Sequence, residues 1–367
     1  MNGALPDMRI RELIENGFIT GAQEENVRPA SLDLSITGEV FRVRGAFLPG
    51  FNETVEEAIK RVGGVALKGE KILLERNCSY ALSLNERVTG LPEGVYAYCN
   101  PKSSSGRVDM HVRLMVDKSS RYDSVEKGYR GPLWLLVVPK TFPVIVSPNL
   151  TLNQLRFFNH DTRLDEFDLE MKFISSGGLL FEPDGKKMGF KDRRHSDRDG
   201  SVLLTLGLHF KHPGFKGLTN GEPLDLKLIR HYDPRYFFEE VQVFEQSLVL
   251  QEEMFYILST REFVRVPASL TCEMVPMDER SGDLRSHYAG FIDPGWGVGA
   301  DGKEHGRPLT LEVRSFDNRI VIQDGQPIAK IRHELMQAMP TGHYDQSAPT
   351  YGLQAGPKLG KQFADWK

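Results

Sequence analysis

Short apolar runs separated by turn residues dominate the chain, and this pattern predicts a mainly β protein. The runs are rich in β-branched, aromatic and leucine residues and recur between glycine, proline, asparagine and aspartate. The clearest runs are 72–74, 80–84, 95–99, 110–116 and 133–138. Near the start, Ile10, Leu13 and Ile14 recur at helical spacing. Asp7 is expected to cap this short helix and Gly17 to end it.

The β pattern occurs twice along the chain. Residues 72–107 resemble residues 248–285, since both run strand, strand, proline turn, strand and charged loop. A weaker echo pairs 30–38 with 200–208, at the start of each half. Two copies at such a long period indicate a duplicated domain and not a solenoid.

A polar, glycine-rich stretch separates the two copies. It covers 175–200 and is typical of a linker. We therefore expect an N-terminal domain over 1–174 and a C-terminal domain over 201–367. A chain of 367 residues with 40% hydrophobic content is long enough to bury two ordinary cores.

The composition limits the kinds of molecule that the protein is expected to bind. The formal net charge is −4, with 26% charged residues, so we expect no binding of nucleic acid polymer or membrane. No apolar run approaches the roughly 20 residues that span a bilayer, and the N-terminal segment is charged where a secretory signal is apolar. The three cysteines are widely spaced and odd in number, which favours reduced thiols. We expect a cytoplasmic protein.

The first segment with possible chemistry is Asn-Pro-Lys-Ser-Ser-Ser-Gly-Arg at 100–107. Its hydroxyls, cations and glycine could gather phosphate oxygens through charge-assisted hydrogen bonds. It is not a Walker loop, because no glycine-flanked Lys-Ser or Lys-Thr ends it. An ordinary solvent-exposed turn remains the alternative.

The second segment comprises 287–296 and the strand 309–315. Period-two alternation places Leu309 and Leu311 on one face of that strand and Glu312 on the other. Glu312 could equally lie on a solvated sheet face, and Asp293 could simply begin the turn at Pro-Gly.

The third segment is the tail, 342–358, which carries tyrosine, glutamine and lysine among small residues. Glycine-rich tails that present donors can close over a ligand. A frayed terminus is the alternative.

Together these segments resemble the signature regions of dCTP deaminases, relatives of the trimeric dUTPases. That family shows a Ser-Ser-x-x-Arg loop, an Ala-x-x-Ile-Asp-Pro-Gly segment, a Leu-Glu strand and a tail with Tyr and Gln. The matches here, in the same order, are 103–107, 289–295, Leu311-Glu312, and Tyr351 with Gln354. The resemblance implies two tandem dUTPase-like distorted jelly-roll or β-barrel domains with few short helices.

By this resemblance, Glu312 is the general base that takes a proton from water and passes it toward the cytosine amino group. Ser103 and Arg107 would position that water and stabilise the tetrahedral centre. The implied reaction is hydrolysis of dCTP to dUTP and ammonia in the supply of dTTP, with Mg²⁺ arriving on the triphosphate. The implied contacts to phosphate, deoxyribose, base edge and closing tail are, in that order, Lys102 and Ser104, Asp293, Ala289, and Tyr344, Tyr351, Gln354 and Lys358.

The sequence also argues against zinc chemistry. Zinc deaminases use His-x-Glu and Pro-Cys-x-x-Cys segments to hold the metal and its water. None of the ten histidines is followed two residues later by glutamate, and no two cysteines stand three apart. We therefore expect no protein-bound metal.

The two halves depart from the family in complementary ways. The N-terminal half ends its segment 131–136 on leucine, where the base is expected, and the C-terminal half has the charged loop 277–285 in place of the serine pair. In the family the site lies between subunits. We therefore expect a composite site, in which an N-terminal lobe supplies 102–107 to a C-terminal lobe carrying Asp293 and Glu312.

Two further expectations follow. Half of the sites should be lost, and chains should associate, because two lobes cannot close the three-lobed ring of the family.

Residues 298–308 are an insertion that would lengthen a turn or gate the site, and Thr350 replaces a lysine that often precedes the tail tyrosine.

Two other functions remain open. A dUTPase, or a bifunctional enzyme that deaminates dCTP and hydrolyses dUTP, would use Asp293 to activate water at the α-phosphate. A catalytically inactive nucleotide-binding regulator would explain the lost motifs. Glu312 favours deamination over both.

Overall fold

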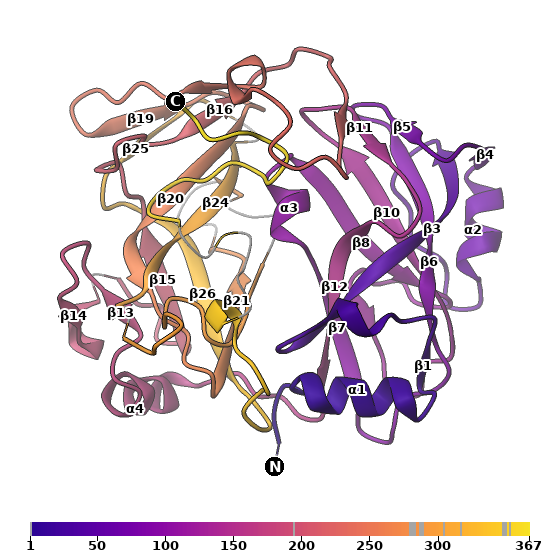
Figure 1. Cartoon of the computed structure of the whole chain (residues 1–367), viewed down its shortest axis with the longest axis horizontal. Helices are drawn as coiled ribbons and strands as arrows, with labels where there is room; N and C mark the ends of the chain where they lie inside the picture. The colour runs from indigo at the N-terminus through magenta and orange to yellow at the C-terminus, as the bar shows by residue number, and fades with distance from the viewer. Residues whose placement is uncertain are drawn as a thin grey trace. The chain divides into compact units, whose positions relative to one another are not determined.

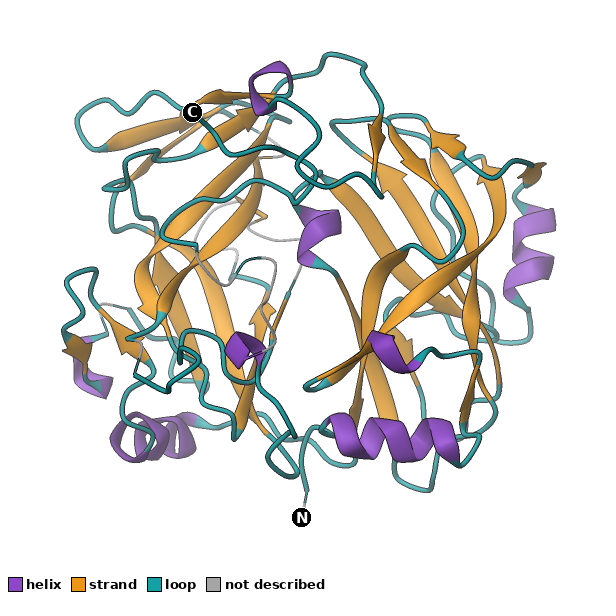
Figure 2. Cartoon of the chain, viewed as in Figure 1, coloured by secondary structure: helices purple, strands orange, loops and turns teal. Residues whose placement is uncertain are grey.

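Antiparallel strands make up most of the regular structure in the computed structural model, which confirms the predicted mainly β fold (Figure 1, Figure 2). The structure describes residues 2–193, 195–278, 284–285, 290–303, 305–315, 318–346, 351 and 354–367. No helix within these residues is long and apolar enough to cross a membrane.

The chain divides into two units that exchange short segments. The N-unit comprises Ala4–His160, Thr219–Pro234 and Gly360–Lys367. The C-unit comprises Asp161–Leu218 and Arg235–Leu359, with the first few residues of the chain. The sequence-based division did not anticipate that two segments from the second half belong to the N-unit.

The N-unit is built on one large antiparallel sheet with the strand order β8-β10-β6-β3-β12-β7-β9. Its helices are α1 (Asp7–Glu15), α2 (Val55–Arg61), α3 (Ser103–Gly106) and the 3-10 helix η1 (Glu24–Asn26). Its strands are β1 (Ile19–Thr20), β2 (Val27–Arg28), β3 (Ser31–Val43), β4 (Val65–Leu67), β5 (Ile72–Leu74), β6 (Ser79–Val88), β7 (Tyr96–Pro101), β8 (Met110–Val116), β9 (Ser124–Val125), β10 (Gly131–Pro139), β11 (Val144–Val146), β12 (Thr151–Phe158) and β17 (Leu224–Asp225). Strand β17 lies in the exchanged segment and pairs with β11.

The C-unit repeats this plan with two sheets. One has the order β14-β13-β20-β16-β18, with β24 paired to β20, and the other has the order β15-β26-β21-β23. Its helices are α4 (Glu166–Ser175), η2 (Phe190–Asp192), η3 (Pro234–Tyr236, at the unit boundary) and η5 (Tyr344–Gln346). Its strands are β13 (Leu180–Phe181), β14 (Lys187–Met188), β15 (Ser201–Thr205), β16 (Phe215–Gly217), β18 (Phe238–Glu240), β19 (Ser247–Leu250), β20 (Phe255–Val264), β21 (Leu270–Val275), β22 (Leu284–Arg285), β23 (Phe291–Ile292), β24 (Arg307–Ser315), β25 (Ile320–Gln323) and β26 (Pro327–Leu335).

Helix α1 confirms the predicted helix and corrects its cap. Pro6 is the N-cap residue and Asp7 is the first helical residue. The Asp7 carboxylate accepts a hydrogen bond from Arg11 one turn later, at 2.6 Å. An acidic residue in the first turn also complements the helix dipole. Gly17 follows the C-cap residue with a φ of 73°, a conformation that favours glycine.

Matching buried carboxyl groups support the internal repeat. Glu86 accepts hydrogen bonds from the backbone N and the hydroxyl of Ser35, both at 2.9 Å. Glu262 accepts the same pair from Thr205, at 2.8 and 2.7 Å. Burial raises the pKa of both carboxyl groups. The same buried carboxyl contact therefore occurs within each unit, and the order of the surrounding strands is also the same.

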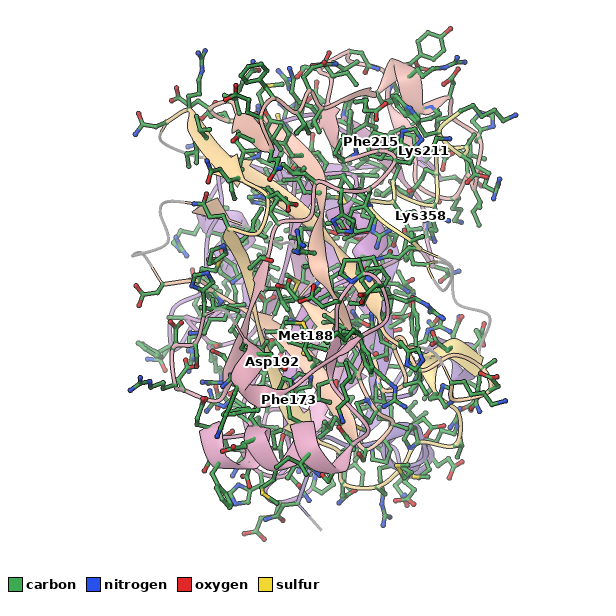
Figure 3. All side chains as sticks on the ribbon, turned by 90° about the vertical axis from the view of Figure 1, so that its left-hand side faces the viewer. Phe173, Met188, Asp192, Lys211, Phe215 and Lys358 are labelled. Carbon is green, nitrogen blue, oxygen red and sulfur yellow. The ribbon has the colours of Figure 1, made fainter. Side chains whose placement is uncertain are left out.

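The core of the C-unit lies under the apolar face of β24. Leu309, Leu311 and Val313 are buried there in one cluster with residues of α4 and β14. Figure 3 shows two members of that cluster, Phe173 and Met188, near one another at the α4 end of the unit. The predicted alternation along 309–315 is confirmed on its apolar side.

His333 distinguishes the two cores. It pairs with Cys272 in the register of β26 with β21, where the N-unit pairs Phe157 with Ala97. The imidazole is fully buried, and neither ring nitrogen has a hydrogen-bond partner within the described residues. Burial lowers the pKa of His333 to about 4.

We expect His333→Phe to flatten the acid side of the stability curve. Because the unfolded histidine has the higher pKa, it binds protons more readily than the folded one, so the free energy of unfolding falls as the pH drops from about 6.5 to about 4. The phenylalanine variant should lose about 3 kcal/mol less than the parent across that window, measured by chemical denaturation. The same change at the exposed His160 should leave the curve unaltered. Parallel curves for the parent and His333→Phe would contradict the assignment.

Candidate active site

The serine loop folds as the single-turn helix α3, directly after β7 (Figure 1). Ser103 and Ser104 are half-buried, and their hydroxyls make no hydrogen bond within the described part of the chain. Ser105 differs, because its buried hydroxyl donates to the Leu152 carbonyl at 2.8 Å. Two of the three hydroxyls are therefore available to a ligand, and the third holds the loop to β12.

Lys102, predicted as a phosphate contact, lies in a cationic cluster around one carboxylate. Its ammonium group forms an ion pair with Asp33 and donates to the Thr151 hydroxyl at 3.1 Å. Arg28 binds the same Asp33 oxygen at 2.8 Å. Lys361 lies near enough that burial and the charge of Lys102 lower the pKa of its ammonium group. Three cations against one buried carboxylate leave net positive charge beside the serine loop.

Arg107 is 4% exposed and lies against the last segment of the chain. A Cβ added to Gly360 would stand 3.6 Å from the Arg107 Cβ, an ordinary van der Waals contact. Backbone hydrogen bonds from Arg230 to Lys361 (2.8 Å) and from His231 to Gln362 (2.9 Å) fix that segment. The end of the chain is thus a packed part of the N-unit.

Glu312 is buried on the polar face of β24, with 2% of its surface exposed. Its neighbours on that face, Thr310 and Arg314, are also buried. The alternative that Glu312 lies on a solvated sheet face is therefore excluded. Asp293 follows β23 and is half-buried at the turn that continues into Trp296.

The described part of the tail is packed along β24, which excludes a frayed terminus there. The Gln354 side chain donates to the Pro308 carbonyl at 2.6 Å and is 3% exposed. The backbone N of Lys358 donates to the Thr310 hydroxyl at 3.3 Å, so the tail lies two residues along the strand from Glu312. Figure 3 shows Lys358 toward the end of the C-unit opposite α4.

Both predicted tail tyrosines are placed in the C-unit. The ring of Tyr344 lies 5.3 Å from that of Trp296, between centroids. Tyr351 is 6% exposed. Ala289, expected at the base edge, and Thr350 lie outside the described residues.

The N-unit has different residues at the positions that correspond to Glu312 and Asp293. Leu136 pairs with Ala81 in β6 as Glu312 pairs with Ile257 in β20. Glu312 follows Leu136 by 176 residues, and Ile257 follows Ala81 by the same number. The strand that corresponds to β23 is β9, which is followed by Glu126 where β23 is followed by Asp293.

Helix α2 covers the Leu136 face of β10. Leu136 and Trp134 belong to a buried apolar cluster with Val55, Ala58 and Ile59 of that helix. Thr54 caps α2 through a capping box with Glu57, which fixes where the helix begins. In the N-unit, apolar side chains therefore occupy the face that corresponds to the face of Glu312 in the C-unit.

We expect Leu136→Glu to destabilise the N-unit strongly. A carboxylate placed under α2 would lose its hydration without gaining a partner, at a cost of about 3–5 kcal/mol. Urea unfolding measures this loss. Leu73→Glu, at a position 47% exposed in the same unit, should change the free energy of unfolding by less than about 0.5 kcal/mol. Equal stability of the two variants would mean that α2 does not exclude water from the Leu136 face of β10.

Sequence reasoning missed Asp33 and Lys361. Asp33 interrupts the apolar strand 32–36 with a charge, which was a usable signal. Lys361 shows no such signal, because its role depends on partners distant in sequence.

Comparison with known proteins identifies the family of the chain. Residues 1–161 match the family model for the N-terminal domain of 2'-deoxycytidine 5'-triphosphate deaminase, and residues 185–363 match the model for its C-terminal domain. A crystal structure of 2'-deoxycytidine 5'-triphosphate deaminase from Agrobacterium tumefaciens is similar, with 31% identity and a TM-score of 0.82 over 92% of this chain and 99% of that one. No curated protein matches. The chain, with its two fused domains, belongs to the 2'-deoxycytidine 5'-triphosphate (dCTP) deaminase family.

Proposed function

We propose that this protein hydrolyses dCTP to dUTP and ammonia without zinc, as a step in the supply of dTTP. The observation that carries the proposal is the burial of Glu312 on the tail-covered face of β24. A carboxylate there can exchange protons with a ligand while bulk water is excluded.

The residues divide the reaction as follows. Glu312 takes one proton from the attacking water while the water oxygen bonds to C4 of cytosine. Glu312 then returns this proton to the amino group, and the bond between C4 and that amino group breaks. One proton of the water ends on ammonia and the other on N3 of uracil, so atoms and charge balance. Arg107 and Ser103 stabilise the tetrahedral centre.

The remaining groups bind the substrate. Ser104 and Lys102 would bind phosphate oxygens, supported by the two unbonded hydroxyls and the cationic cluster. Asp293 would bind deoxyribose, and Ala289 the base edge. The tail residues Tyr344, Tyr351, Gln354 and Lys358 would close over the nucleotide, with Mg²⁺ held on its triphosphate.

We further infer that one reaction uses residues from both kinds of unit, within one chain or between associated chains. The support is complementary loss. The N-unit has Leu136 in place of the glutamate, and the C-unit sequence 277–285 has no serine pair.

The test is to incubate the protein with dCTP and Mg²⁺ and resolve all products. Equal amounts of ammonia and dUTP are expected. Ammonia with dUMP and pyrophosphate would support the bifunctional alternative, and binding without turnover would support a regulator. Either result would overturn the proposal as stated.

A further inference from the structure

Asparagine is followed by glycine at three places in the chain, at residues 2, 16 and 220. Such a pair can react within itself, because glycine has no Cβ to keep its backbone nitrogen away from the preceding carboxamide. The reaction needs a backbone N–H that the fold does not hold and a side-chain amide that can turn toward it. The surroundings of the three pairs therefore decide which of them reacts in the folded protein.

The pairs at residues 2 and 16 are held by the fold. The side-chain amide of Asn16 donates to the Glu12 carbonyl at 2.7 Å, and the backbone N of Gly17 donates to a carbonyl of α1 at 2.9 Å. Gly3 is buried against the backbone of Gln337, since a Cβ added to Gly3 would lie 2.0 Å from the Gln337 nitrogen. In both pairs, a bonded or packed backbone opposes the rotation that the reaction requires.

The pair at residue 220 lies in the exposed loop 219–222 of the N-unit, shortly before β17. Gly221 has a φ of 78°, and no described atom outside its chain neighbours lies within 4 Å of a Cβ added to it. Asn220 and Gly221 also line an open cavity of about 500 Å³ within this unit. The carboxamide of Asn220 therefore has room to turn, and water has access to it.

A hydrogen bond already orients the Asn220 carboxamide. Its oxygen accepts from the backbone N of Glu222 at 3.1 Å. This contact, from one residue to the second one after it, brings the side chain back over the Gly221 peptide. A donor at that oxygen also stabilises the negative charge that develops there when a nucleophile adds to the carboxamide carbon. The exposed pair is thus both accessible and activated.

We propose that Asn220 is a site of spontaneous deamidation in the folded protein. The backbone nitrogen of Gly221 bonds to Cγ of Asn220, and the bond from Cγ to the side-chain nitrogen breaks. That nitrogen leaves as ammonia with the proton of the Gly221 N–H, and a cyclic imide remains. Water then opens the imide at Cγ, which gives aspartate, or at the main-chain carbonyl, which gives isoaspartate. One water is consumed for each ammonia released, so atoms and electrons balance.

The products change the approach to β17. Isoaspartate adds one methylene to the backbone shortly before Leu224, whose N donates to the Pro143 carbonyl at 2.9 Å. Both products also place a new carboxylate in the cavity that Glu75 lines, and like charges repel. We therefore expect deamidation to lower the melting temperature of the protein.

This reaction is independent of the proposed function. The pair at residue 220 releases at most one ammonia per chain and no dUTP, whereas turnover of dCTP releases ammonia and dUTP in equal amounts. Slow ammonia release without dUTP is therefore expected from aged protein even when no nucleotide is present.

The test follows the asparagines of the folded parent protein during incubation at mildly alkaline pH. Trypsin cleaves after Lys216 and Lys227, so Asn220 lies in the peptide 217–227 and Asn16 in a separate peptide. Mass spectrometry should show peptide 217–227 converting from amide to acid, as aspartate and isoaspartate forms, at least about 10-fold faster than the Asn16 peptide. In urea the two pairs should react at similar rates, because the fold no longer distinguishes them.

Asn220→Gln is the matched control, since the longer side chain closes the imide ring much more slowly. In this variant, peptide 217–227 should keep its amide, and dUTP formation from dCTP should match that of the parent. Deamidation of Asn220 in a protein that forms no dUTP would overturn the proposed function but support this site. Equal rates at Asn16 and Asn220 in the folded parent, or an Asn220 that reacts only in urea, would overturn the site.

Discussion

Replacing Glu312 with glutamine is expected to abolish ammonia release from dCTP while nucleotide binding is largely retained. Glutamine has the same shape but cannot accept and return a proton, and general acid-base catalysis typically contributes about 10²–10⁴-fold. We expect kcat to fall by at least about 10²-fold. The dissociation constant for dCTP should change by less than about 3-fold. Steady-state ammonia assays and calorimetric titration measure the two quantities.

The matched control is Glu262→Gln, in the neighbouring strand β20. Glu262 is also buried in the C-unit, but its oxygens are occupied by Thr205. Its replacement should lower the melting temperature and leave kcat of the folded protein unchanged. If Glu312→Gln kept parental turnover, Glu312 would not be the base.

Arg107→Lys is expected to give the second largest loss, about 100-fold in kcat. A donor aimed at the developing charge is worth about 10²–10³ in rate, and lysine lacks the planar fork that can hold two oxygens. The native arginine is buried, so its direction is fixed by the protein. Single-turnover ammonia release measures the loss of the chemical step.

The control for Arg107 is Arg113→Lys. Arg113 lies on β8 of the same unit, is 53% exposed and pairs with Asp123 at 2.7 Å. Its replacement should leave turnover unaltered, since exposed pairs contribute little. Equal rates in Arg107→Lys and the parent would remove Arg107 from the chemistry.

The strands and the repeat could be predicted because each depends on local pattern. Short apolar runs between turn residues predicted strands at 110–116 and 133–138, and the structure has β8 and β10 there. The echo between 30–38 and 200–208 is also matched, since Ser31 and Ser201 begin equivalent strands β3 and β15. These signals require only neighbouring residues.

Burial of the polar face of β24 could not be predicted in this way. Alternation indicates that Thr310, Glu312 and Arg314 point away from the core, and such a face is normally solvated. Here the tail, more than forty residues further along the chain, hydrogen-bonds to Pro308 and Thr310. Long-range covering of this kind leaves no trace in the spacing of the strand itself.

The same limit applied to charges. Lys102 was predicted to contact phosphate from its place in the loop, but its contact with Asp33 could not be predicted, because Asp33 stands 69 residues away in sequence. Ser105 was one of three similar hydroxyls, and only the fold shows that it binds Leu152. The residue types therefore indicated the chemistry that the loop can perform, whereas only the fold shows which contacts each side chain makes.

The central claim is that two unequal units provide the residues of one site per chain. The most direct test is to titrate the inactive Glu312→Gln protein with dCTP and Mg²⁺ in a calorimeter and count bound nucleotide. The account predicts one dCTP per chain, with binding weakened when Ser104 and Lys102 are also replaced. Two dCTP molecules per chain would contradict it, because each unit would then hold a complete binding site of its own.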